Sequence, residues 1–189
     1  MSHLIHLVDN TLTDKNTVHS YLDLYHNLLE HKRDSASHIL EVGINQGGSI
    51  KLWKDFFQNA TIHALDVEIG WLRPTAFAVG DPRISVHVTD AYNETWFRWT
   101  FLDTGIRFEM MLDDGPHTLE SMQQFIRLYS QVMKPDVILI IEDVQSPDWL
   151  PHLVAATPPE LQPYIKTYDL RHVKGRYDDL VFTIDKTQQ

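Results

Sequence analysis

Short apolar segments that end in an acidic residue recur along this 189-residue chain, and stretches of helical periodicity separate them. Segments that are apolar on both faces are typical of strands in a parallel sheet covered by helices on both sides. The predicted strands of this kind are 38–43, 60–67, 83–90, 108–113 and 137–142. Helical spacing predicts helices over 17–32, 49–57 and 118–133, whereas the proline cluster at 147–163 is interpreted as a loop region.

The end of the chain has a different pattern. Segments 164–169 and 180–184 flank the polar stretch 171–179, a spacing that suits an antiparallel hairpin at the sheet edge. The sequence therefore predicts an α/β fold with a Rossmann-like, doubly wound, mostly parallel seven-stranded sheet, an antiparallel C-terminal hairpin and helices on both faces. We expect one domain, 1–189, with an N-terminal helical cap or lid over 1–35 and a Rossmann-like core over 36–189.

Composition excludes several classes of function. The 16 Lys and Arg against 26 Asp and Glu give a net charge of −10, so the chain lacks the basic surface that nucleic acid and anionic membranes require. With no cysteine, disulfides, thiolate metal sites and a cysteine nucleophile are excluded. The N-terminus lacks the pattern of an export signal and no window approaches 18 uninterrupted apolar residues, so we expect a cytoplasmic protein.

The ends of the predicted strands carry most of the acidic candidates. In open sheets of this type ligands bind outside the carboxyl ends of the strands. The turn that follows the first strand, 41–49, has glycines at 43, 47 and 48 that allow close approach to a ligand. Asp66 ends the next strand, where a carboxylate can accept hydrogen bonds from both ribose hydroxyls of an adenosine. Asp90 and Ala91, at the end of the third strand, would border the adenine of that adenosine.

These residues resemble class I S-adenosylmethionine (SAM)-dependent methyltransferases, whose first motif has the form acid-x-Gly-x-x-x-Gly. The sequences Asp113-Asp114-Gly115-Pro116-His117 and Ile141-Glu142-Asp143, with the early Thr13-Asp14-Lys15 and His19-Ser20-Tyr21, narrow the resemblance. They are similar to the metal-dependent sugar O-methyltransferases of macrolide biosynthesis and the related cephalosporin-hydroxylase-type family. The similarity runs from about residue 13 to residue 185, and Pro116 departs from the small polar residue expected before the histidine.

The resemblance implies a role for each candidate. SAM would contact Glu41, Gly43, Asn45, Gln46, Gly47, Ser49, Asp66, Asp90, Ala91 and Asp113. Asp114, Glu142 and Asp143 would hold Mg²⁺ or Mn²⁺, for which carboxylates are suitable hard ligands. The catalytic residues would be Asp114 and His117, with His117 as the general base. Lys15, His19, Tyr21 and Trp149 are candidates for substrate contact or for a lid.

The chemistry of methyl transfer agrees with these roles, because an alcohol becomes a good nucleophile when a metal polarises it and a base removes its proton. We therefore expect a SAM- and Mg²⁺-dependent O-methyltransferase acting on a sugar, nucleotide sugar or glycoside. The alternatives are a metal-dependent hydroxylase of the cephalosporin-hydroxylase type and a non-catalytic cofactor-binding homologue. The oligomeric state stays open, although related enzymes commonly self-associate into homo-oligomers.

Overall fold

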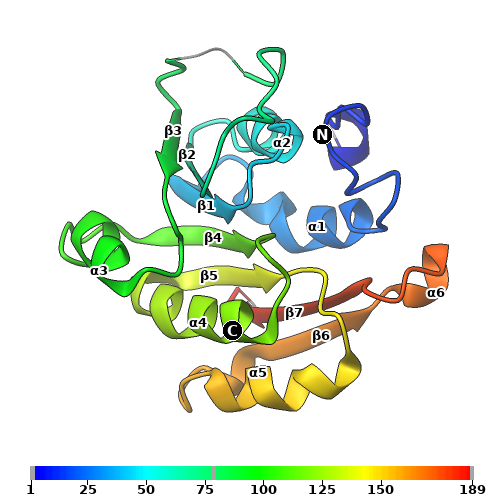
Figure 1. Ribbon diagram of the computed structural model, residues 1–189, viewed down its shortest axis with the longest axis vertical. Coiled ribbons are helices and arrows are strands. Elements are labelled where there is room, and N and C mark those ends of the chain that lie inside the picture. The colour runs from blue at the N-terminus through cyan, green and yellow to red at the C-terminus, as the bar shows by residue number, and fades with distance from the viewer. Residues whose placement is uncertain (1–2, 78–79, 188–189) are drawn as a thin grey trace.

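The computed structural model describes residues 3–77 and 80–187, and seven strands in this part of the chain form one sheet (Figure 1). The strands are β1 (His38–Val42), β2 (Thr61–Asp66), β3 (Ile84–Val88), β4 (Phe108–Asp113), β5 (Met133–Ile141), β6 (Ile165–Asp169) and β7 (Leu180–Asp185). Their order is β3-β2-β1-β4-β5-β7-β6, in which β1 to β5 run parallel and β7 is antiparallel to both neighbours. The predicted fold class is confirmed.

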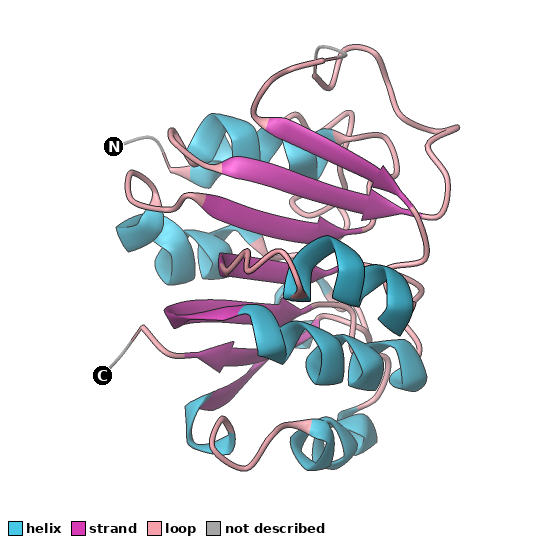
Figure 2. Cartoon of the chain, turned by 90° about the vertical axis from the view of Figure 1, so that its left-hand side faces the viewer, coloured by secondary structure: helices cyan, strands magenta, loops and turns pink. Residues whose placement is uncertain are grey.

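Helices cover both faces of the sheet (Figure 2). They are α1 (Leu22–Leu29), α2 (Gly48–Phe56), α3 (Glu94–Phe97), α4 (Leu119–Tyr129), α5 (Leu150–Ala156) and α6 (Arg171–Lys174). Successive strand residues point to opposite faces, so Ile39 packs in the core shared with α1 and α2, whereas Leu40 packs in the core shared with α4 and α5. This alternation explains why consecutive residues of the central strands, such as Ile39 and Leu40, are both apolar and buried.

Four predicted elements differ from the structure, among them the strand predicted over 137–142. The interpretation of 147–163 as a loop is wrong, because α5 lies there; Pro147 and Pro151 occupy first-turn positions, where the missing amide hydrogen costs nothing. Helix α1 begins at Leu22 rather than at residue 17, since the amides of residues 17–19 all bond to the Asp14 carbonyl. The predicted helix over 118–133 is α4 plus a short 3-10 turn, and β5 begins directly after it at Met133.

The strand order defines where a ligand can bind, which is the side of the sheet formed by the carboxyl ends of its parallel strands. We call this side the rim. The chain leaves β1 for β2 on one side and returns to β4 on the other, so β1 and β4 flank the point at which the order reverses. The carboxyl ends of β1 to β5 meet at this rim. Among the described residues, no helix is long and apolar enough to cross a membrane.

Candidate active site

A cavity of about 650 Å³ opens at the rim, which is within the size range of small-molecule and cofactor sites. It is lined by Leu12, Thr13, Asp14, Val42, Gly43, Ile44, Asn45, Gly48, Ser49, Asp66, Val67, Thr89, Asp90, Ala91, Tyr92, Asp114, Gly115, Pro116, His117 and Asp143. The lining therefore extends from the glycine turn after β1 to the acidic residues after β4 and β5.

The glycine turn holds its shape through Gly43 and Asp66. Gly43 has φ +96°, and a Cβ at this position would lie 2.2 Å from the Asp114 carbonyl oxygen. Asp66 Oδ2 accepts hydrogen bonds from the amides of Ile44, at 2.8 Å, and Asn45, at 3.4 Å. The Asp66 carboxylate thus lies at the cavity wall, joined to the turn.

The structure divides the residues predicted to contact SAM into two groups. Gly43, Asn45, Ser49, Asp66, Asp90 and Ala91 line the cavity. The other four, described next, lie outside the lining. Glu41 is buried and accepts a 2.5 Å hydrogen bond from Trp53 Nε1, and Asp113 accepts one of 2.5 Å from the Tyr92 hydroxyl.

Gln46 and Gly47 complete this second group. Gln46 Oε1 accepts a hydrogen bond from Arg73 Nε at 3.2 Å, which directs the Gln46 side chain toward the loop between β2 and β3. Gly47 packs beneath Leu72 and Ala76, where a Cβ would lie 2.6 and 2.8 Å from their side chains. In the structure, these four residues contact the protein around the glycine turn and the strand ends and do not line the cavity.

Asp114, His117 and Asp143 converge on one side of the cavity. His117 Nε2 lies 3.7 Å from Asp114 Oδ1 and 3.6 Å from Asp143 Oδ2. One ligand atom from each of the three residues lies within 4.8 Å of the others, so the group could hold a metal ion. His117 and Asp143 have φ values of +52° and +55°, a conformation that costs a non-glycine residue free energy and is concentrated at functional sites.

Glu142 lies deeper and is already held on both of its carboxylate oxygens. Oε1 accepts a hydrogen bond of 2.5 Å from Lys15 Nζ, and Oε2 accepts one from the Tyr25 hydroxyl. Lys15 Nζ also donates to Asp114 Oδ2 at 2.7 Å and lies 3.4 Å from Glu41 Oε1. We call Glu41, Asp114, Glu142 and Asp143 the carboxylate cluster.

Burial dominates the acid–base behaviour of this cluster. It raises the pKa of Asp114 to about 7, an effect that Glu142 reinforces and Lys15 opposes. Burial likewise raises the pKa of Glu142 and of Asp143. For Lys15, burial acts to lower the pKa, but the carboxylates of Asp114, Glu142 and Glu41 outweigh it and raise the pKa well above its usual value. The cluster thus favours a bound positive charge.

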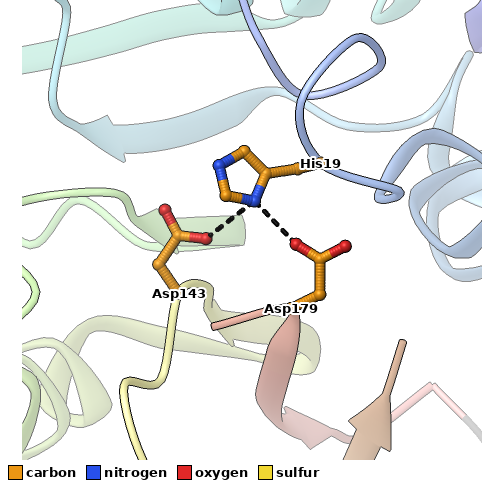
Figure 3. A group of neighbouring side chains, drawn as sticks. All are labelled: His19, Asp143 and Asp179. Carbon is orange, nitrogen blue, oxygen red and sulfur yellow. Dashed lines mark hydrogen bonds and ion pairs between the residues drawn. The ribbon is translucent and has the colours of Figure 1, made fainter. Parts of the chain in front are cut away.

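The N-terminal segment supplies two more partners for Asp143. Figure 3 shows one ring nitrogen of His19 facing the carboxylates of both Asp143 and Asp179. This atom, Nδ1, lies 3.3 Å from Asp143 Oδ1 and 2.7 Å from Asp179 Oδ1. The three residues form the second group whose ligand atoms lie within 4.8 Å of one another. Tyr21 stacks on His19 with ring centroids 5.0 Å apart, and its hydroxyl donates to Asp143.

The structure therefore brings Lys15, His19 and Tyr21 to the acids at the rim, whereas Trp149 packs against the core beside α4 and α5. Sequence reasoning missed Tyr25 and Asp179 as partners of the site. Tyr25 lies four residues after Tyr21, one turn along the same side of the helix, and that spacing was the available signal. Asp179 has no comparable signal, because it reaches His19 from a position 160 residues later in the chain.

Solved structures that share this fold include methyltransferases. MycE methyltransferase from the mycinamycin biosynthetic pathway, in complex with Mg, SAH and mycinamycin VI, matches with a TM-score of 0.74 and 17% identity over 97% of this chain and 53% of that chain. The cmcI structure with Mg and SAM matches with a TM-score of 0.57 and 18% identity over 86% of this chain and 70% of that chain. The chain has the Rossmann-like fold of the class I SAM-dependent methyltransferases.

A curated relative makes the likeness more specific. The chain is 25% identical over 151 residues to demethylmacrocin O-methyltransferase of Streptomyces fradiae, an alignment that covers 76% of this chain and 36% of the relative. This chain thus spans little more than a third of that enzyme's length. No protein-family model matches the chain.

Proposed function

We propose that this chain binds SAM and Mg²⁺ or Mn²⁺ and transfers the SAM methyl group to a hydroxyl of a sugar, nucleotide sugar or glycoside. The observation that carries the proposal is one continuous cavity whose wall includes Asp66 and the glycine turn as well as Asp114, His117 and Asp143. A nucleoside site and a cation site in one cavity suit a reaction between a bound methyl donor and a metal-held alcohol. The sequence likeness to demethylmacrocin O-methyltransferase supports the same reaction class.

The residues present fit the methyl donor. The cavity has the volume of a cofactor site, and its Asp66 carboxylate lies beside the backbone of the glycine turn, where it can accept hydrogen bonds from ribose hydroxyls. Asp90 and Ala91 form the part of the wall proposed to contact the adenine. When bound, SAM supplies an electrophilic methyl group on a positively charged sulfur, which suits a cavity lined by carboxylates.

The residues also fit a divalent cation. The Lys15 ammonium lies between Asp114 and Glu142, so a positive charge already occupies part of the carboxylate cluster. The donors are carboxylate oxygens, which Mg²⁺ and Mn²⁺ prefer, and we propose Asp114, Glu142 and Asp143 as the ligands. When bound, the cation supplies Lewis-acid polarisation that lowers the pKa of the acceptor hydroxyl.

We propose that His117 removes the proton from that hydroxyl. Its side chain is 32% exposed and lines the cavity, and its Nε2 faces Asp114 and Asp143 at 3.7 and 3.6 Å. An acceptor hydroxyl held at these carboxylates would lie within reach of Nε2. We propose that segment 1–35, which the structure describes from residue 3 on, caps the site, since Lys15, His19 and Tyr21 contact the acids at the rim.

Calorimetry with SAM tests the cofactor part of the proposal. We expect the wild type to bind SAM and Asp66→Ala to bind it at least about tenfold more weakly, because a ribose hydrogen-bond acceptor is lost. Asp103→Ala, which removes an exposed carboxylate outside the cavity lining, serves as the matched control. Absence of SAM binding by the wild type would refute the proposal.

The role of His117 is tested by His117→Gln. Loss of a general base should lower methyl transfer by about 10²- to 10⁴-fold while leaving the dissociation constants of SAM and Mn²⁺ within a fewfold of the wild type. If Mn²⁺ binding weakens together with transfer, His117 is a metal ligand instead of the base. Transfer that continues in the presence of excess chelator would show that the carboxylates are structural.

The acceptor class is tested by measuring methyl transfer to a panel of free sugars, nucleotide sugars and macrolide glycosides. Because the relative is a demethylmacrocin O-methyltransferase, demethylmacrocin is the first glycoside to include. Transfer to none of the three classes, with SAM and Mn²⁺ both bound, would favour a non-catalytic cofactor-binding protein.

A further inference from the structure

Lys15 is the most deeply buried cationic group at the rim. Its side chain is 1% exposed, and its Nζ lies 2.7 Å from Asp114 Oδ2 and 2.5 Å from Glu142 Oε1. Burial of a lysine is costly unless it is paired, and here two carboxylates of the proposed metal site provide the pairing. The ammonium therefore lies where a cation bridging Asp114 and Glu142 would have to lie.

Glu142 has no side open to the cavity in this arrangement. Its second oxygen, Oε2, accepts the hydrogen bond from Tyr25, and the side chain is 2% exposed. Glu142 also lies outside the group of candidate ligands that Asp114, His117 and Asp143 form among the described residues. A divalent cation can use Glu142 only if Lys15 moves away from it.

We propose that Lys15 is an internal competitor of the divalent cation: its ammonium occupies the Glu142 side of the carboxylate cluster and thereby sets how tightly the site binds metal. This inference rests on the metal site of the proposed function and adds a residue that controls it. A lysine in this position stabilises the buried carboxylates of the metal-free protein, which would otherwise repel one another. The same positive charge opposes the approach of a divalent ion through Coulomb repulsion at short distance.

Lys15→Met tests the proposal, because methionine has a similar length and no charge. We expect the dissociation constant for Mn²⁺, measured by electron paramagnetic resonance on the purified chain without acceptor, to fall at least about tenfold relative to the wild type. Lys32→Met is the matched control, since Lys32 is also 1% exposed and pairs with Asp136 at 2.6 Å, outside the carboxylate cluster. Its Mn²⁺ affinity should equal that of the wild type.

Three results of this measurement would overturn the inference. Equal Mn²⁺ affinity of Lys15→Met and the wild type would show that the ammonium does not compete. Weaker binding by Lys15→Met would show that Lys15 instead holds the ligands in place for the metal. If neither protein binds Mn²⁺, both the inference and the metal part of the proposed function fail. If Lys15→Met binds Mn²⁺ more tightly but the wild type transfers no methyl group to any acceptor class, only the proposed function is refuted.

A measurement on the wild type covers the case in which Lys15→Met does not fold. In ¹⁵N-labelled protein, the lysine Nζ signals can be followed during titration with Mg²⁺. We expect the Lys15 signal to shift as its contacts with Asp114 and Glu142 are broken, while the Lys32 signal stays unchanged. Saturation with Mg²⁺ without a shift at Lys15 overturns the proposal.

Discussion

Acid should destabilise this protein through a row of three histidines that crosses the first strands of the sheet. His63 is 8% exposed, and its Nε2 and Nδ1 lie 3.2 Å from His38 Nδ1 and 3.5 Å from His87 Nε2. Burial, together with the neighbouring His87 and His38, lowers the pKa of His63 from 6.5 to about 4. The rings of Phe101 and Phe108 pack edge-on against it, with no counter-charge from either.

The size of the effect follows from the linkage of protonation to folding. Between pH 6.5 and about 4 the unfolded chain binds a proton at His63 that the folded protein does not, so stability decreases as the pH falls through this window. The pKa of His63 differs by about 2.5 between the unfolded and the folded chain, and each pKa unit corresponds to about 1.36 kcal/mol. Acidification should therefore lower the free energy of unfolding by about 3 kcal/mol. The lowered pKa values of His38 and His87 act in the same direction.

The assay is urea unfolding, followed by tryptophan fluorescence at a series of pH values, for the wild type and His63→Gln. The difference in unfolding free energy between the two proteins should change by about 3 kcal/mol between pH 7 and pH 4. Contributions of the buried acids, whose raised pKa values have the opposite effect, are common to both proteins and cancel. His152→Gln, at an exposed position on α5, is the control for loss of a histidine. Equal pH dependence of wild type and His63→Gln would refute the reasoning.

Two further substitutions test the packing that supports the site. Gly43→Ala should lower the free energy of unfolding by about 2 kcal/mol or more, because φ is +96° and the new Cβ would lie 2.2 Å from the Asp114 carbonyl oxygen. Gly105→Ala, at φ +77° with no atom within 4 Å of the added Cβ, should cost clearly less; equal losses in thermal or urea unfolding would contradict the steric argument. Trp53→Phe should cost about 2 kcal/mol in urea unfolding, because buried Glu41 loses the 2.5 Å hydrogen bond from Nε1. The same change at exposed Trp99 should have little effect, and an equally small change at Trp53 would show that the bond adds no net stability.

The sequence alone was sufficient for the fold class and for gathering the acids of several strand ends at one rim, where the structure has its cavity. Runs such as 110–112 and 137–141 carry apolar residues at consecutive positions, which points to strands buried on both faces of a covered sheet. The acids that follow these runs necessarily meet at one rim, because parallel strands end on the same side. The helix within 147–163 could not be predicted from its prolines, because proline disrupts a helix interior but is compatible with a first turn.

What the tertiary structure decided is which acids face the cavity and which are already paired. Spacing cannot show that Glu142 is held by Lys15 from 127 residues earlier, or that His19 lies between Asp143 and Asp179. Local periodicity determines the direction of a side chain relative to its own strand or helix. Its partners depend on how distant segments pack, and here that packing places a buried ammonium inside the proposed metal site.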